Sequence, residues 1–148
     1  MNSGSISYQI KTAGKEQIYS HLMECNDSFV PPLTERVNIA EYSQKLYEKA
    51  VTFEAWSNNK LIGLIAAYFD DTNSSSFITD VSIIKKYMKL GIATNLLNMC
   101  ITYTREKKIK EIKLEVHKDN LPAITFYNKF DFAKTDTKED SLVMKLAI

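Results

Sequence analysis

Hydrophobic positions in the first third of the chain recur at helical spacing. Ile18, Leu22 and Cys25 follow an i, i+4, i+7 pattern, which predicts an amphipathic helix. Pro31–Pro32 cannot continue a helix, so an irregular connection is expected there. A second helix is expected to begin after Asn38, because an Asn side chain at the N-cap accepts a hydrogen bond from a free backbone N–H. The apolar face of that helix is formed by Ile39, Tyr42, Leu46 and Ala50.

The hydrophobic pattern then changes to the two-residue period of β-strands. Apolar runs at 51–56 and 61–69 flank a polar turn and predict a hairpin. The remaining strands are expected at 5–10, 77–84, 111–117 and 141–147, and further helices at 93–104 and 120–130. In the strand at 77–84, alternation assigns one face to Ile78, Asp80, Ser82 and Ile84.

The order of these elements predicts an α/β fold with a mixed central sheet. The early strands follow one another as antiparallel neighbours, whereas the later strands alternate with helices. A doubly wound parallel sheet is not expected, because no crossover helices separate the early strands. With 148 residues, positions 1–148 are expected to form a single domain.

Composition and charge narrow the classes of partner. The chain is 45% hydrophobic and 25% charged, with a net charge of +1, which gives no reason to expect nucleic acid or an anionic membrane. The basic run at 105–113 alternates with acids and is typical of a solvated helix end followed by a strand. No stretch approaches the roughly 20 apolar residues of a membrane span, and the start of the chain lacks a signal segment. Cys25 and Cys100 indicate neither a metal site nor a disulfide framework, so reduced core thiols in a cytoplasmic protein are expected.

A glycine at the start of the strongest helical pattern is the first chemical signal. Gly91 lies between the strand at 77–84 and the helix at 93–104. The start of a helix leaves backbone N–H groups without partners and favours anions, and a residue without a Cβ lets phosphate approach the backbone. The segment matches neither the phosphate loop of nucleotide hydrolases nor the dinucleotide fingerprint, so both activities are set aside.

Residues 83–93 resemble the acetyl-CoA motif of the GNAT superfamily of N-acetyltransferases, (Q/R)-x-x-G-x-(G/A). Gly91 and Ala93 match its small positions, whereas Met88 stands at the Gln/Arg position and Leu90 where a basic residue is common. The resemblance implies that main-chain N–H groups hold the pyrophosphate of acetyl-CoA, which any side chain permits. Lys89 and Lys129 are the candidates for the 3′-phosphate. The cofactor-binding residues implied are Ile83, Ile84, Lys85, Met88, Lys89, Leu90, Gly91, Ile92, Ala93, Thr94, Asn120 and Lys129.

A second block, at 114–132, resembles the superfamily pattern L-E-V-x-x-x-N-x-x-A-i-x-(F/L)-Y-x-k-x-G-F. Its clear departure is Asp131 at the position of Gly, where a left-handed helix cap is expected at a cost of about 1 kcal/mol. The resemblance implies the GNAT fold: a mixed sheet of about seven strands, splayed between the fourth and fifth, with helices on both faces. Those two strands are here 77–84 and 111–117.

The resemblance also implies catalytic roles. Tyr127 matches the tyrosine that approaches the sulfur of CoA, and it is assigned as the general acid. Glu115 is the preferred general base, with Asp80 as the alternative carboxylate. Asn120 suits both an N-cap and a contact to the cofactor or an active-site water. His117 shares the strand face of Glu115, and a satisfied surface histidine is the favoured interpretation.

The function implied is transfer of an acetyl group from acetyl-CoA to a primary amine by direct attack. A GNAT-fold module that binds acetyl-CoA without catalysis is the alternative. The acceptor, a small-molecule amine or a protein N-terminus, is expected to bind near 25–47. That segment offers Asn26, Asp27, Ser28, Phe29, Glu35, Arg36 and Tyr42. The oligomeric state stays open between monomer and homodimer.

Overall fold

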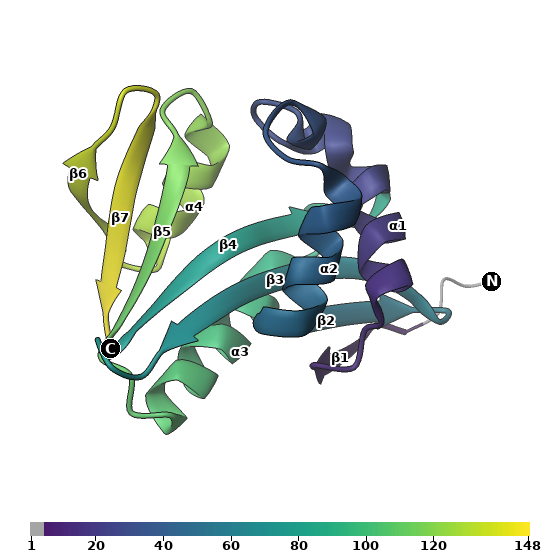
Figure 1. Cartoon of the computed structure of the whole chain (residues 1–148), viewed down its shortest axis with the longest axis horizontal. Coiled ribbons are helices and arrows are strands. Elements are labelled where there is room, and N and C mark those ends of the chain that lie inside the picture. Colours follow the sequence, from purple (N-terminus) through teal and green to yellow (C-terminus); the bar gives the residue numbers. More distant parts are fainter. Residues whose placement is uncertain (1–4) are drawn as a thin grey trace.

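A seven-stranded mixed sheet forms the frame of the structure, a computed structural model that describes residues 5–148 (Figure 1). The strands are β1 (Ser7–Ile10), β2 (Val51–Ser57), β3 (Lys60–Asp70), β4 (Ser75–Ile83), β5 (Glu111–His117), β6 (Ala133–Thr137) and β7 (Ser141–Ala147). Their order is β1-β2-β3-β4-β5-β7-β6, and only β4 and β5 pair in parallel within the described chain. This arrangement confirms the predicted α/β fold with a mixed sheet.

Four α-helices and three single turns of 3-10 helix connect the strands of the described chain. They are α1 (Lys15–Cys25), η1 (Asn26–Ser28), η2 (Leu33–Glu35), α2 (Ile39–Lys49), η3 (Lys85–Tyr87), α3 (Ile92–Glu106) and α4 (Leu121–Lys129). The predicted N-cap is confirmed, since Asn38 Oδ1 accepts a hydrogen bond from Glu41 N at 3.0 Å. In residues 5–148 no helix is long and apolar enough to cross a membrane.

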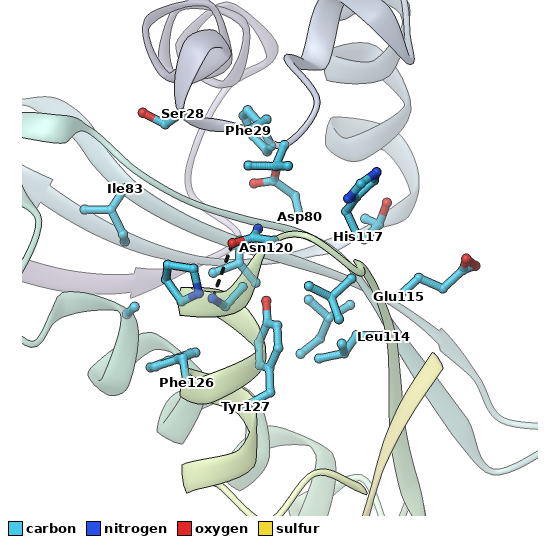
Figure 2. A pocket seen from close by; sticks show the side chains of 18 of the residues that line it. Ser28, Phe29, Asp80, Ile83, Leu114, Glu115, His117, Asn120, Phe126 and Tyr127 are labelled. Carbon is cyan, nitrogen blue, oxygen red and sulfur yellow. Dashed lines mark hydrogen bonds between the residues drawn. The ribbon is translucent and has the colours of Figure 1, made fainter. Parts of the chain in front are cut away.

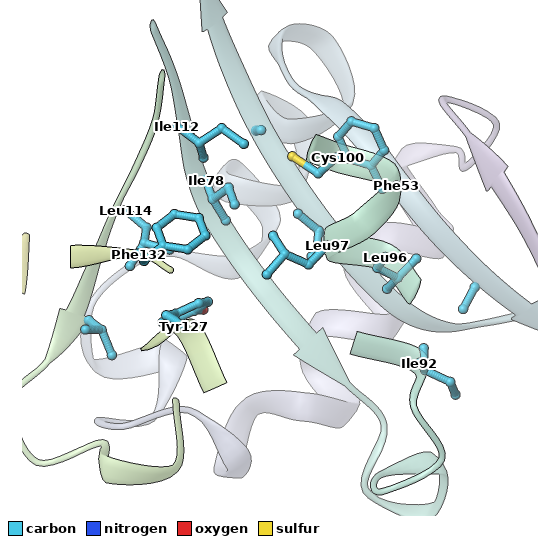
Figure 3. Close-up of a cluster of buried hydrophobic side chains, with 14 of the residues drawn as sticks. Phe53, Ile78, Ile92, Leu96, Leu97, Cys100, Ile112, Leu114, Tyr127 and Phe132 are labelled. Carbon is cyan, nitrogen blue, oxygen red and sulfur yellow. The ribbon is translucent and has the colours of Figure 1, made fainter. Parts of the chain in front are cut away.

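Each face of the sheet carries its own hydrophobic cluster. In Figure 1, α1 and α2 cover the front of β2–β4, and α3 lies behind these strands. The front cluster includes Ile18, Leu22, Leu46 and Leu64. The rear cluster joins α3 to β5 and α4 (Figure 3), with members that include Phe53, Leu97, Cys100, Ile112, Tyr127 and Phe132. Both cysteines are buried free thiols, as expected.

The two halves of the sheet separate between β4 and β5. The strands pair only from Ser75–Ile78 against Glu111–Leu114, and they diverge beyond this point (Figure 1). This confirms the predicted splay between the fourth and fifth strands. The site therefore has to be sought where the parallel pairing ends.

A β-bulge at Thr79 coincides with the start of the splay. Opposite β4, Ala66 pairs with Asp80 and Ala67 with Ile78, so Thr79 has no partner in this register. The two-residue period is broken there. Ile78 therefore packs in the rear cluster, whereas Asp80 lies on the face of α1 and α2. The predicted common face for these two residues is wrong, because alternation cannot anticipate the extra residue.

A close contact sets the position of the start of α3. A Cβ added to Gly63 of β3 would lie 2.9 Å from Ile92 Cγ2 and 3.0 Å from Ile83 Cδ1. Only a residue without a side chain allows α3 to begin this near the sheet. Gly63 belongs to no motif, so the sequence alone does not indicate this role.

Candidate active site

A cavity of about 360 Å³ occupies the splay between β4 and β5. Its walls come from five segments: the connection after α1, the second half of β4, the start of α3 with the residues just before it, the end of β5 and the first turns of α4. Figure 2 labels side chains around this space from all of these segments except the one at the start of α3. Because the strands no longer pair here, side chains of β4 and β5 can face a ligand between them.

A second cavity, of about 260 Å³, lies at the start of α3. Its lining shares Ile83, Met88, Ala93 and Phe126 with the first cavity. The two cavities therefore adjoin. An elongated ligand can run from the helix start into the splay.

The start of α3 presents free backbone N–H groups to the second cavity. Gly91 is the N-cap, with φ of 80°, and no side chain caps this helix. The first hydrogen bond of the helix runs from Asn95 N to Gly91 O at 3.1 Å, so the N–H groups of Ile92, Ala93 and Thr94 have no intrahelical acceptor. A Cβ built on Gly91 would meet nothing within 4 Å. The space in front of these N–H groups suits a phosphate-bearing ligand.

The structure brings together most of the residues predicted to bind the cofactor. Those lining the second cavity are Ile83, Met88, Lys89, Gly91, Ile92, Ala93 and Thr94, while Asn120 lines the first. Ile84 is buried, and its N–H donates to Ile62 O at 2.9 Å. Lys85, Leu90 and Lys129 line neither cavity. Their roles in cofactor binding stay predictions that these cavities do not support.

Tyr127 lies in the floor of the first cavity. Only 7% of its surface is exposed, and its ring packs against Phe126 and Phe132. In Figure 2 its hydroxyl points from α4 toward Asn120. Burial raises the pKa of Tyr127, with a smaller contribution from the charge of Asp80. The phenol therefore keeps its proton at neutral pH.

Asn120 fixes the start of α4 beside the splay. Its Oδ1 accepts a hydrogen bond from Ala123 N at 3.3 Å, which confirms the predicted N-cap. Tyr127 follows two turns later on the same helix. The cap therefore helps to place the tyrosine under the cavity.

Asp80 is a buried carboxyl group that lines the cavity from β4. It is 3% exposed. Its Oδ2 accepts a hydrogen bond from Ser82 Oγ at 2.8 Å, whereas Oδ1 has no hydrogen-bond partner within residues 5–148. Burial raises the pKa of Asp80 from 3.8 to about 7, against smaller opposing effects of Ser82 and Arg36. A carboxyl group with this pKa can accept and release a proton near neutral pH.

Glu115 lines the rim of the cavity from β5. As predicted, it lies opposite the buried Leu114 and is itself exposed. Its carboxylate binds Lys138 Nζ at 3.0 Å and Ser141 Oγ at 3.3 Å. Figure 2 shows this carboxylate pointing away from Tyr127 and Asp80.

His117 also lines the cavity, near the end of β5. Its Nδ1 accepts a hydrogen bond from Asp119 N at 3.1 Å. In the neutral ring the proton is therefore on Nε2. The expected satisfied surface histidine agrees with this contact.

The connection after α1 closes one end of the cavity. Ser28, Phe29 and Arg36 of the predicted acceptor segment line it, and Arg36 lies over the Phe29 ring at 5.8 Å. Tyr42 has a structural contact instead, because its hydroxyl donates to Thr79 O at 2.9 Å. Asn26 accepts a hydrogen bond from Thr34 N at 2.8 Å and thereby holds the loop.

Sequence reasoning missed a buried histidine that contacts Ser82, the hydrogen-bond partner of Asp80. His21 is 2% exposed on α1, and its Nε2 lies 2.9 Å from Ser82 Oγ on β4. The available signal was the position of His21 on the apolar side of α1, adjoining Leu22 and one turn before Cys25. A histidine on a buried helix face requires polar partners.

Comparisons with known proteins agree with this arrangement. The model of the Acetyltransferase (GNAT) family matches residues 15–132. Over 102 residues the chain is 29% identical to N-alpha-acetyltransferase 30 of Schizosaccharomyces pombe. This alignment covers 63% of this chain and 68% of that protein. Over 85 residues it is 31% identical to streptothricin acetyltransferase A of Bacillus subtilis. That match covers 57% of this chain and 49% of the relative, so the chain spans about half of the relative's length.

A solved structure has the same fold. Naa50 of Arabidopsis thaliana, in complex with the bisubstrate analogue CoA-Ac-MVNAL, superposes with a TM-score of 0.78. The alignment covers 97% of this chain and 99% of that one, at 24% identity.

Proposed function

The chain belongs to the GNAT family of acetyltransferases, and from this premise we propose that it acetylates a primary amine in the cavity between β4 and β5. Acetyl-CoA is the co-substrate and supplies the acetyl group as a thioester. One observation carries the proposal. The residues that carry the free N–H groups of α3 line one of two adjoining cavities, and Tyr127 and Asp80 line the other.

The start of α3 is the proposed site for the pyrophosphate. The N–H groups of Ile92, Ala93 and Thr94 need an acceptor, and Gly91 leaves the approach open. Main-chain donors make this contact independent of the side chains at Met88 and Leu90. The departures from the family motif at these two positions are therefore compatible with binding.

Tyr127 is the proposed general acid. Its raised pKa keeps the phenol protonated, and the hydroxyl is directed into the cavity (Figure 2). When the carbon–sulfur bond breaks, Tyr127 donates its proton to the departing sulfur. It is restored by the second proton that the attacking nitrogen loses.

Asp80 is the proposed general base, in preference to Glu115. A protonated amine cannot attack, so a base must first remove one proton from the nitrogen. Asp80 Oδ1 has no hydrogen-bond partner among residues 5–148, and burial raises the pKa of this carboxyl group to about 7. The Glu115 carboxylate is paired with Lys138 and directed away from the cavity.

The proposed acceptor is a primary amine of a small molecule or of a peptide N-terminus. Ser28, Phe29 and Arg36 lie where it would enter. The name of one relative described above is N-alpha-acetyltransferase, and the name of the other is streptothricin acetyltransferase. Both kinds of amine therefore belong in an assay.

The test is release of the CoA thiol from acetyl-CoA in the presence of a panel of peptides, amino sugars and small amines. With the best acceptor, Tyr127→Phe is expected to lower kcat by about 100-fold, because it removes the general acid. Tyr103→Phe, the same change in the rear cluster away from the cavity, is the matched control and should retain activity. Equal turnover by Tyr127→Phe and the parent would exclude the acid role, and no thiol release with any amine would contradict the proposed reaction.

A further inference from the structure

A chain of buried polar groups extends from Asp80 into the layer between β4 and α1. Ser82 Oγ lies 2.8 Å from Asp80 Oδ2 and 2.9 Å from His21 Nε2. His21 Nδ1 lies 3.0 Å from Leu61 O. The three side chains are 2–6% exposed, so bulk water does not replace these partners.

The chemistry of the partners fixes the state of His21. A carbonyl oxygen can only accept, so Nδ1 must carry a proton and donate it to Leu61 O. Burial lowers the pKa of His21 to about 4, so the ring is neutral at neutral pH. Its Nε2 is then an acceptor that faces the Ser82 hydroxyl.

The Ser82 hydroxyl has a single proton and two possible acceptors. When Asp80 is ionised, Ser82 donates to Asp80 Oδ2, and the Cys25 thiol, 3.7 Å from His21 Nε2, can donate to the ring. When Asp80 is protonated on Oδ2, the carboxyl group donates to Ser82 Oγ. The hydroxyl then reverses and donates to His21 Nε2. In both states the Ser82 hydroxyl and His21 Nδ1 have an acceptor, and the carboxyl proton has one when it is present.

We propose that His21 is a positioning residue for the general base: by accepting the Ser82 hydroxyl, it lets that hydroxyl reverse and allows Asp80 to hold the proton taken from the amine. The proposal rests on the proposed function, in which Asp80 is the base. In this step a nitrogen–hydrogen bond breaks, its electron pair stays on nitrogen, and an oxygen–hydrogen bond forms on Oδ1 of Asp80. A half-turn of the carboxyl group about its Cβ–Cγ bond then brings the protonated oxygen to the position that faces Ser82 Oγ. Ser82 keeps its proton and only changes the acceptor, so no further co-reactant is needed.

Other polar groups near this chain do not supply the acceptor. Three charged groups affect the pKa of Asp80, His21 or Cys25: Glu24 on α1, Arg36 after η2 and Lys60 on β3. Three tyrosines have pKa values that the charge of Asp80 raises: Tyr42 on α2, Tyr68 on β3 and Tyr127 on α4. Glu115 and His117 on β5 line the same cavity. Ser82 Oγ lies within hydrogen-bond distance of Asp80 and His21, and a hydrogen bond between Ser82 and the Cys25 thiol also acts on that thiol.

The test is a titration of Asp80 followed by carboxyl 13C NMR in the full chain without ligand, with Asp80→Asn to assign the signal. His21→Leu is expected to lower the pKa of Asp80 by about 1 unit, because the protonated state loses its acceptor chain. Ser82→Ala should raise the pKa, since the ionised carboxylate loses its charge-assisted hydrogen bond. His21→Gln, which can donate to Leu61 O and accept from Ser82, should restore the parental value.

Ser76→Ala is the matched control, a buried serine on the same strand whose hydroxyl contacts Glu111 O instead. It should leave the pKa of Asp80 unchanged. In the active enzyme, the acidic limb of the pH profile of kcat/KM should move with the pKa in each variant. Shifts of the same sign in His21→Leu and Ser82→Ala, or no shift in a folded His21→Leu, would overturn the proposal.

A measurement on the unmodified chain keeps the test decisive if His21→Leu does not fold. 15N NMR should show His21 neutral with its proton on Nδ1 at neutral pH, and its Nε2 signal should move as Asp80 titrates. A proton on Nε2 would overturn the proposal. These readouts need no turnover, so a chain that titrates as expected but transfers no acetyl group would contradict the proposed function and leave the role of His21 intact.

Discussion

Two buried carboxyl groups, Glu54 and Asp80, differ in how many hydrogen bonds they accept, and this difference suits them to different roles. Glu54 on β2 is 0% exposed, and its oxygens accept hydrogen bonds from donors on Thr12, Ala13, Thr52 and Trp56. It ties the segment before α1 to the sheet. Asp80 accepts one hydrogen bond and keeps Oδ1 without a partner in the described chain. Within residues 5–148, only the second group has an oxygen whose hydrogen-bonding capacity is unused.

Replacing each candidate base by its amide distinguishes them. Asp80→Asn is expected to lower kcat/KM near pH 7 by at least about 100-fold, because an amide cannot accept the amine proton. Glu115→Gln should change it by less than about threefold, since its carboxylate is directed to Lys138. Thiol release at saturating acetyl-CoA measures both. The reverse ranking would return the role to Glu115.

The residues that sequence could predict are those with a motif. Tyr127 and Asn120 belong to a spaced pattern, and both line the predicted cavity. His21 carried no motif and lay in a stripe that read as apolar. Asp80 was assigned to a strand face by alternation, and the bulge at Thr79 changed which neighbours share that face. Local insertions of this kind depend on pairing across strands, which a single sequence does not record.

At the scale of elements, the turn after α4 departs from the family pattern, because Asp131 stands at the position of Gly. Asp131 follows the helix with φ of 70°, in the left-handed region predicted for it. Phe132 N then donates to Tyr127 O at 3.2 Å, so this turn is tied to the backbone of the proposed acid. A residue with a Cβ is strained in this conformation.

Asp131→Gly is expected to stabilise the chain by about 1 kcal/mol, because glycine adopts this conformation without strain. The measurement is the free energy of unfolding from urea denaturation. Asp71→Gly, at an exposed turn residue without positive φ, is the control and should be neutral or destabilising. A loss of stability in Asp131→Gly would show that the aspartate side chain contributes more than its backbone strain costs.

Most strands and α-helices followed from periodicity, and the strand that did not has a physical explanation. The strands at 111–117 and 141–147 match β5 and β7, and the helix starts at Asn38 and Asn120 match α2 and α4. Strand β6 was absent from the predicted elements. All of its residues are exposed, so it carries no alternation of apolar and polar positions. Only the resemblance to the family indicated a seventh strand.

For the whole molecule, the buried pair Asp80 and His21 gives opposing contributions to stability. The folded-state pKa of Asp80 is raised to about 7, so between about pH 4 and 7 the folded chain binds more protons than the unfolded chain, and stability falls as pH rises. The folded-state pKa of His21 is lowered to about 4, so between about pH 4 and 6.5 the unfolded chain binds more protons, and stability rises with pH. The two contributions offset each other within the shared window.

Replacing Asp80 should reveal the contribution of His21 to the pH dependence of stability. The stability of Asp80→Asn relative to the parent is expected to increase by roughly 3 kcal/mol between about pH 4.5 and 6.5. The substitution removes the contribution of Asp80, which falls as pH rises, and leaves that of His21, which rises with pH. Urea denaturation at the two pH values measures it. Asp136→Asn, an exposed change on β6, should show a constant difference. A constant difference for Asp80→Asn as well would mean that the carboxyl group titrates normally.

The exposure of β6 also bears on self-association. Among residues 5–148 this strand pairs with β7 alone, so its other side offers unpaired backbone groups to a strand from a second molecule. Lys134 and Asp136 stand at alternate positions along it. A second sheet docking there would have to strip water from these charges. The exposed, charged residues of β6, which leave the strand without an alternating hydrophobic pattern, thus also disfavour addition of further strands at this edge of the sheet.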